Sequence, residues 1–130
     1  METKKLEHGT INWHDLTVEN ADELKEFFKE VAGWQIQEIP MKNGDEAYHD
    51  YAMKDSKGNG VAGVCHAKGP NMGIPPQWMM YISVENINQS VEKALDNGGK
   101  LIKEYKSKEG ILVYAIIEDP AGATFALAQI

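Results

Sequence analysis

The sequence predicts an α+β fold in which one β-α-β-β-β module occurs twice. Three observations support this prediction. The chain has 130 residues, which is enough for one domain with its own core. Residues 18–38 share seven identities with the segment 66 positions further on. Strand-like and helix-like hydrophobic patterns also follow one another in the same order in both copies.

The repeat defines the two modules. Val18-Glu19-Asn20 recurs as Val84-Glu85-Asn86. The same offset pairs Glu26 with Glu92, Gly33 with Gly99, Ile36 with Ile102 and Glu38 with Glu104. Further along, the offset shortens to 63, so that Tyr51-Ala52 matches Tyr114-Ala115, because the second copy lacks three residues of a turn. The modules therefore span about 10–66 and 78–130, within a single domain covering 1–130. The segment 67–77, rich in Gly and Pro, is expected to be an exposed linker between them.

The first module begins with an alternating strand over 13–18, followed by a helix. Asn20 is expected to cap this helix, with Glu23 at the capping-box position, and Gly33 is expected to end it. One apolar stripe on the helix is expected to be buried, formed by Leu24, Phe27, Phe28 and Val31.

The second module repeats this pattern. Asn86 is the expected cap of a helix that ends at Gly98-Gly99. Its apolar face carries Ile87, Val91, Ala94 and Leu95. Three short strands follow each helix, at 34–39, 47–53 and 60–66, then at 100–105, 111–117 and 123–129. The segment 118–122, with the sequence EDPAG, is expected to form a tight turn with a structural role.

Composition excludes several classes of protein. The formal net charge is −7 and the basic residues are scattered, which argues against a nucleic-acid partner. No apolar run is long enough for a membrane span, and the first residues contain no signal-like apolar segment. The lone Cys65 cannot form an internal disulfide, so a cytoplasmic location is expected.

Three segments, at 11–34, 75–102 and 118–129, carry a resemblance to a known superfamily. The chain resembles the vicinal oxygen chelate proteins, which include glyoxalase I, bleomycin-resistance proteins and extradiol dioxygenases. It is most similar to small bacterial glyoxalase-like proteins related to lactoylglutathione lyase. The resemblance implies that the two modules form an incompletely closed mixed β-barrel around a ligand cavity, with the helices outside. It also implies a homodimer as a possible assembly.

The superfamily often binds a divalent metal, and the resemblance identifies four positions to inspect. They are occupied by Trp13, Gly63, Met79 and Ala126. Indole N–H is only a donor, thioether is a soft and weak ligand, and Gly and Ala have no donor atom. The sequence therefore predicts no metal and no other cofactor.

A displaced metal site at His14 and His66 is the alternative. It requires the first strand to slip by one residue, which would turn Leu16 and Val18 from the helix toward the cavity. Ordinary roles for both histidines are therefore favoured.

Strand alternation predicts which side chains face the cavity. They are Trp13, Asp15, Thr17, Gly63, Cys65, Met79, Tyr81, Ser83, Thr124, Ala126 and Ala128. Small residues beside Trp13, Met79 and Tyr81 suit a small organic or aromatic ligand, unless these side chains simply fill one another. Asp15 is a candidate catalytic acid or base and Tyr81 a candidate hydrogen-bond donor. Cys65 is expected to have a small apolar role.

These features leave three functions open. The first is a module that binds a small molecule without chemistry, as bleomycin-resistance relatives do. The second is a lyase or isomerase related to lactoylglutathione lyase, either without a metal or with a displaced metal site. The third is a subunit that mainly contacts another chain.

Overall fold

The computed structural model describes residues 6–130, and these form two compact units. One unit is His14–Trp78, here called the N-module. The other, the C-module, is Met79–Ile130 together with the described residues up to Trp13. The start of the chain belongs to the C-module because Gly9 N donates to Ser83 O at 2.7 Å and Ser83 N donates to Thr10 O at 2.8 Å.

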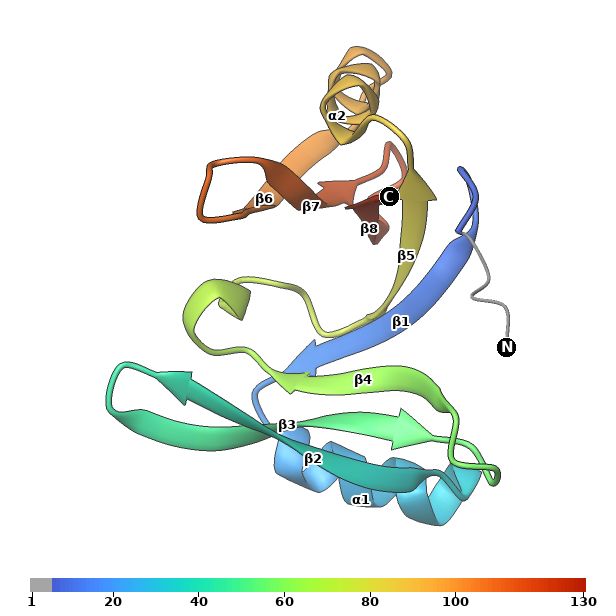
Figure 1. Cartoon of the computed structure of the whole chain (residues 1–130), viewed down its shortest axis with the longest axis vertical. Helices are drawn as coiled ribbons and strands as arrows, with labels where there is room; N and C mark the ends of the chain where they lie inside the picture. Colours follow the sequence, from blue (N-terminus) through green and yellow to red (C-terminus); the bar gives the residue numbers. More distant parts are fainter. Residues whose placement is uncertain (1–5) are drawn as a thin grey trace. The chain divides into compact units, whose positions relative to one another are not determined.

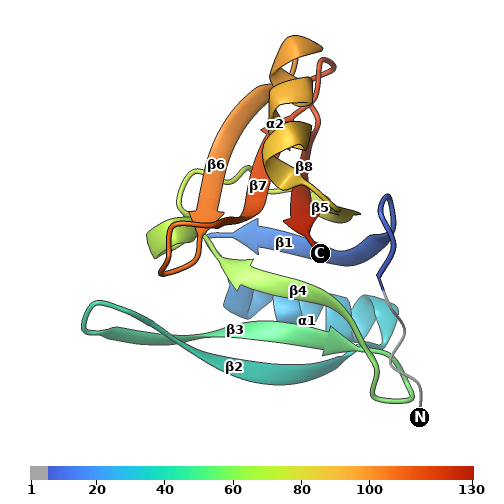
Figure 2. The ribbon, with the colours of Figure 1, turned by 45° about the horizontal axis from the view of Figure 1, so that its top comes forward.

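The N-module contains one helix and four strands. They are β1 (Ile11–Val18), whose part from His14 on belongs to this module, α1 (Ala21–Ala32), β2 (Gln35–Asn43), β3 (Glu46–Lys54) and β4 (Gly60–His66). The strands lie in the order β2-β3-β4-β1, with β1 parallel to β4 and the other pairs antiparallel. Helix α1 covers one face of this sheet (Figures 1 and 2).

The C-module repeats this arrangement. Its elements are β5 (Trp78–Val84), α2 (Ile87–Asp96), β6 (Lys100–Lys106), β7 (Leu112–Glu118) and β8 (Thr124–Gln129). The strand order is β5-β8-β7-β6, with β5 parallel to β8, and α2 packs on one face (Figure 2). The predicted α+β class and the twice-repeated β-α-β-β-β order are therefore confirmed.

Strand β2 is longer than expected, since it continues through Pro40 to Asn43. The predicted strand ended at residue 39, directly before this proline, which has no backbone N–H to donate. The structure accommodates it at the outer strand of the sheet, where one side of the backbone has no ladder partner.

Each module has its core between the helix and the sheet. In the N-module, Leu16, Val18 and Val64 pack with Leu24 and Phe28 of α1. In the C-module, Val84 and Leu127 pack with Ile87 and Val91 of α2. Leu16 and Val18 therefore face the helix, as the alternation predicted. The helix stripe is only partly buried, however, since Phe27 and Val31 are exposed.

The two helix caps differ although the residues are the same. Asn86 accepts a hydrogen bond from Gln89 N at 3.1 Å, as an N-cap does. Asn20 makes no such bond, and its side chain instead donates to Glu23 Oε2 at 3.3 Å. The capping box predicted at Asn20 is therefore wrong, because this side chain turns toward Glu23 rather than toward a backbone amide.

The repeated glycines also serve different purposes. Gly33 ends α1 in the left-handed conformation, with φ at 71°. Its counterpart Gly99 is needed for close approach, because a Cβ there would lie 2.9 Å from Ala94 O and 3.1 Å from Glu118 O.

The linker 67–77 is not simply exposed, which corrects the prediction. It contains a 3₁₀ turn, η1 (Gly69–Asn71), and Ile74 is only 7% exposed. An apolar side chain thus anchors the segment. The expected turn at 118–122 is present, since Asp119 Oδ1 accepts from Ala121 N and Ala123 N at 2.8 and 3.0 Å.

Candidate functional site

In the N-module, the predicted site residues lie on the sheet face opposite α1. The register of β1 and β4 sets Asp15 opposite Gly63 and Thr17 opposite Cys65. On the next strand, Ala52 lies opposite Gly63. On the β4 side, the residue opposite Asp15 therefore has no side chain.

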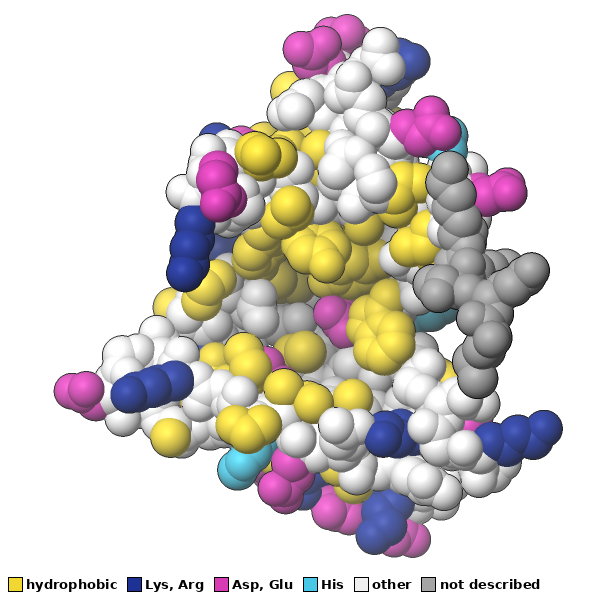
Figure 3. All heavy atoms as spheres, in the orientation of Figure 1, with side chains coloured by type: hydrophobic (Ala, Val, Ile, Leu, Met, Phe, Trp, Pro, Cys, Tyr) yellow, Lys and Arg dark blue, Asp and Glu magenta, His cyan; other side chains and the backbone are white. Residues whose placement is uncertain are grey.

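The C-module has the corresponding arrangement. Tyr81 lies opposite Ala126 and Ser83 opposite Ala128. The Tyr81 ring contacts the Tyr114 ring edge to face, with the centroids 5.8 Å apart. Hydrophobic side chains gather over β5, β7 and β8 in the space-filling view (Figure 3). This face thus combines two tyrosines with small residues.

The predicted cavity residues consequently fall into two groups. The N-module holds Asp15, Thr17, Gly63 and Cys65, while the C-module holds Trp13, Met79, Tyr81, Ser83, Thr124, Ala126 and Ala128. Within the C-module, Met79, Ser83 and Ala126 are completely buried. A single cavity shared by both groups stays a prediction.

Asp50 on β3 is a residue that the sequence analysis missed. It is only 6% exposed and its Oδ1 accepts from His66 N at 2.8 Å. Burial, together with the negative charges of Asp15 and Asp50, raises the pKa of the Cys65 thiol. Cys65 is therefore held as a thiol, which makes it a poor nucleophile. The alternation of β3, with Tyr48, Asp50 and Ala52 on one face, was the available signal for Asp50.

His66 lies between two carboxylates. Its Nδ1 is 3.3 Å from Asp50 Oδ1 and its Nε2 is 3.5 Å from Asp22 Oδ1. The hydroxyl of Tyr51 donates to the same oxygen of Asp22. This hydrogen bond from Tyr51, with a smaller contribution from His66, lowers the pKa of Asp22. The cluster links the first turn of α1 to β3 and β4.

His14 lies elsewhere in the N-module. It lines a small cavity of about 210 Å³ with Trp34, Val61, Ala62 and Trp78. His66 lies four residues beyond Ala62 along β4, about 13 Å at 3.3 Å per residue. Because both ring nitrogens of His66 already face carboxylates, the geometry favours a structural role over a shared metal site with His14. Among residues 6–130, no group of three or more His, Cys, Asp or Glu is arranged to hold a metal ion.

Ser83 has a special position in the C-module. Its side chain is completely buried, and its Oγ forms no hydrogen bond within the described part of the chain. Other buried polar side chains are Thr17, Asp50, His66 and Thr124. A buried hydroxyl without a partner costs stability, and such groups occur at binding sites.

Comparison with known proteins assigns the family. A family model described as "Glyoxalase-like domain" matches residues 13–128. The chain is 30% identical over 122 residues to "Putative glyoxylase CFP32" of Mycobacterium bovis, covering 93% of this chain and 46% of that protein. The same identity and coverage hold for the Mycobacterium tuberculosis protein of that name. The chain thus spans about half the length of these curated relatives.

Solved structures support the fold. A hypothetical protein of Bacillus halodurans has a TM-score of 0.57 at 9% identity, covering 95% of this chain and 96% of that one. Methylmalonyl-CoA epimerase of Mycobacterium tuberculosis has a TM-score of 0.54 at 12% identity, covering 99% and 92%. Among residues 6–130, no helix has both the length and the apolar character needed to cross a membrane. The chain belongs to the glyoxalase-like domain family and has the vicinal oxygen chelate fold.

Proposed function

We propose that this glyoxalase-like protein binds a small organic ligand on the sheet faces that turn away from its helices. The register carries this proposal: Asp15 lies opposite Gly63, and Tyr81 lies opposite Ala126. Each module thus sets one polar side chain beside a position with little or no side chain. A ligand carbonyl or hydroxyl would gain a specific partner there without displacing bulky groups.

The ligand is bound, in this proposal, without the divalent metal common in the superfamily. The residues at the four relevant positions do not fit a metal. Trp13 offers only an N–H donor and Met79 a thioether, while Gly63 and Ala126 offer no donor atom. No step of the proposed function therefore uses a metal.

A second function, a metal-independent lyase or isomerase, is favoured by the same pair of residues. The Asp15 carboxylate is a suitable general base, and the Tyr81 phenol is a suitable hydrogen-bond donor to a carbonyl, each on the face of its own module. The solved neighbours include an epimerase and the curated relatives carry a glyoxylase name. In this function Asp15, on the N-module face, would accept the proton of a C–H bond next to a substrate carbonyl and return it to a carbon of the same substrate.

A thermal-shift screen of small aromatic and carbonyl compounds, run with a metal chelator present, tests ligand binding. A compound that raises the melting temperature of the full chain is then titrated against Asp15→Asn and Tyr81→Phe. We expect the variant on the face that holds the compound to bind it about tenfold more weakly, as for loss of one hydrogen bond to a charged or polar group. His14→Asn is the matched control, because His14 neighbours Asp15 but lies in the pocket with Trp34 and Trp78.

Unchanged binding in both variants would overturn the proposed ligand face. Elemental analysis of protein purified without added metal tests whether the protein functions without a divalent metal. A stoichiometric transition metal would overturn metal independence. Proton exchange at the carbon next to a carbonyl, lost in Asp15→Asn, would establish the enzymatic alternative over simple binding.

A further inference from the structure

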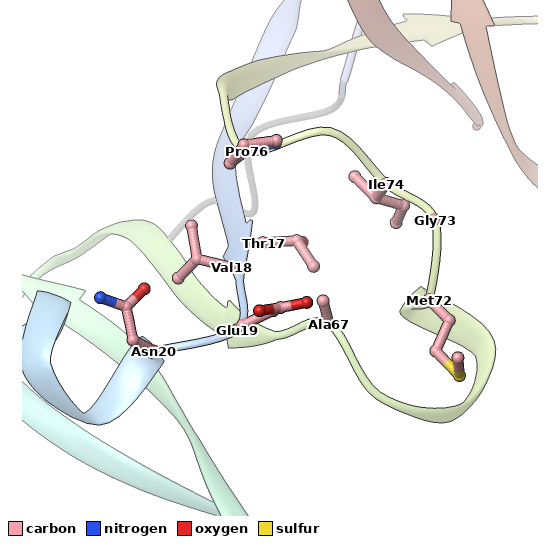
Figure 4. Close-up of a pocket in the computed structure, with 9 residues that line it drawn as sticks. All are labelled: Thr17, Val18, Glu19, Asn20, Ala67, Met72, Gly73, Ile74 and Pro76. Atoms are coloured by element: carbon pink, nitrogen blue, oxygen red, sulfur yellow. The ribbon is translucent and has the colours of Figure 1, made fainter.

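A pocket of about 440 Å³ lies in the N-module at the end of β1. Among the nine residues that line it are Thr17, Val18, Glu19, Ala67, Ile74 and Pro76 (Figure 4). The volume falls in the range of about 300–1,000 Å³ found for small-molecule sites. Only Thr17 belongs also to the ligand face proposed above, so the two sites differ.

The linker builds one wall of this pocket. Ala67 N donates to Val18 O at 2.9 Å, which extends the β1–β4 pairing by one residue. The turn η1 then reverses the chain, and Gly73 adopts a φ of 87° before the buried Ile74. Because this wall is held by backbone hydrogen bonds and an apolar anchor, the pocket is part of the folded module.

The duplication explains why this end of the N-module is open. Val18 lies opposite His66, and in the C-module Val84 lies opposite Gln129. Gln129 covers its helix start: its Oε1 accepts from Ile87 N at 2.8 Å and its Nε2 donates to Glu85 O at 2.7 Å. His66 is instead directed to Asp22 and Asp50. Gln129 therefore covers the helix start in the C-module, whereas His66, at the corresponding position of the N-module, contacts other residues.

The lining residues define the ligand chemistry. Val18, Ile74, Pro76 and Met72 supply apolar walls, and the Thr17 hydroxyl belongs to a side chain only 3% exposed. Glu19 is the one charged residue among the nine that line the pocket, and no Lys or Arg lies among them. In Figure 4 its side chain is drawn beside Ala67 and below Thr17. A pocket with several apolar side chains and a single carboxylate in its lining is complementary to a cation with an apolar body.

We propose that this pocket binds a small organic ammonium ion. The ammonium group contacts the Glu19 carboxylate, and a short apolar chain lies against Ile74, Val18 and Pro76. The site does not depend on the ligand face carrying Asp15 and Tyr81, neither of which lines the pocket.

Butylammonium is the probe, with butanol and butyrate as neutral and anionic counterparts of equal length. Each is titrated into the full chain while the backbone amides of Ala67, Gly73 and Ile74 are followed by NMR. We expect saturable shifts of these amides with butylammonium, and affinity at least about fivefold weaker for butanol and butyrate.

Two variants localise the charge. Glu19→Gln should weaken butylammonium binding about fivefold, which is typical of a partly exposed ion pair. Glu85→Gln is the matched control, since Glu85 is the repeat counterpart of Glu19. Ala67→Leu should abolish binding by filling the pocket, and the dispersion of the other amide signals reports whether it folds.

Three results would overturn the proposal. They are the absence of saturable shifts at these amides, equal binding of butanol or butyrate, and equal weakening by Glu19→Gln and Glu85→Gln. Asp15→Asn and Tyr81→Phe should leave butylammonium binding unchanged, so failure here and failure of the proposed ligand face are distinguishable.

Discussion

Replacing Ser83 by alanine should make the protein more stable. The Ser83 side chain is completely buried, and its Oγ has no hydrogen-bond partner in the described part of the chain. A buried hydroxyl in this state costs about 1–3 kcal/mol of folding free energy. Removing one oxygen also removes a few van der Waals contacts, worth about 0.1–0.2 kcal/mol each. The net expectation for Ser83→Ala is a gain of about 0.5–2 kcal/mol, or roughly 3–5 °C in melting temperature per kcal/mol.

Urea unfolding followed by circular dichroism measures this change. Thr17→Val is the matched control, because Thr17 is the repeat counterpart of Ser83 but lines a pocket. Thr17 Oγ1 is not among the described buried atoms that lack a hydrogen-bond partner, so this variant should gain less than about 0.5 kcal/mol. A loss of stability in Ser83→Ala beyond that amount would refute the reasoning, because it would mean that the hydroxyl has a stabilising partner.

The ligand provides a second readout for Ser83. If the buried hydroxyl is retained for binding on the Tyr81 face, Ser83→Ala should gain stability while losing affinity for a compound found in the thermal-shift screen. Unchanged affinity in a stabilised variant would separate Ser83 from the proposed ligand face.

Three further predictions concern particular residues. Gly99→Ala should lower the free energy of unfolding in urea by about 1–3 kcal/mol, because its Cβ would collide with two backbone oxygens. Gly33→Asn should lower it by less than about 1 kcal/mol, because Asn tolerates a left-handed φ. Equal losses of stability in the two variants would contradict this reasoning. Tyr51→Phe should raise the pKa of Asp22, followed by NMR titration. The pKa of Asp22 is lower in the folded chain than in the unfolded chain, so its carboxylate stabilises the fold at pH values above the unfolded pKa, and this stabilisation is lost as the pH falls. The wild type should therefore lose more stability than Tyr51→Phe on acidification from neutral pH. Parallel pH profiles of stability would exclude this linkage. Cys65 should react with iodoacetamide more slowly at pH 8 than the same chain unfolded in urea, since its thiol pKa is raised, and equal rates would contradict the buried thiol.

Local sequence patterns were sufficient for the elements and for the faces of the strands. The repeat, the helix stripes and the alternation of Leu16 and Val18 predicted two modules, each with its helix packed on one face of its own sheet, which the structure confirms. These properties depend on neighbouring residues, since the 3.6-residue and two-residue periods assign each side chain to a face. The same patterns overestimated burial of the α1 stripe, because exposure depends on what packs against it.

Local sequence patterns were not sufficient to predict the contacts within the candidate site. Alternation placed Asp15 and Tyr81 on the faces opposite the helices. The alternation of β3 indicates a face for Asp50 but not its contacts, because the fold brings it to Cys65 and His66 from another strand. Contacts of this kind join positions far apart in the sequence, and their chemistry appears only after the strands pair.

The sequence by itself determined the class of fold, the duplication and the residue types available at the superfamily's metal positions, because composition, periodicity and motif spacing are properties of the chain. The tertiary structure alone decided which residues lie opposite one another, and hence that Asp15 meets Gly63 while His66 meets Asp22 and Asp50. It also decided that Gly33 and Gly99, equal in the repeat, meet different requirements. The physical reason is that strand register and side-chain direction at strand ends depend on turns, twist and packing from the whole module, which no local pattern encodes.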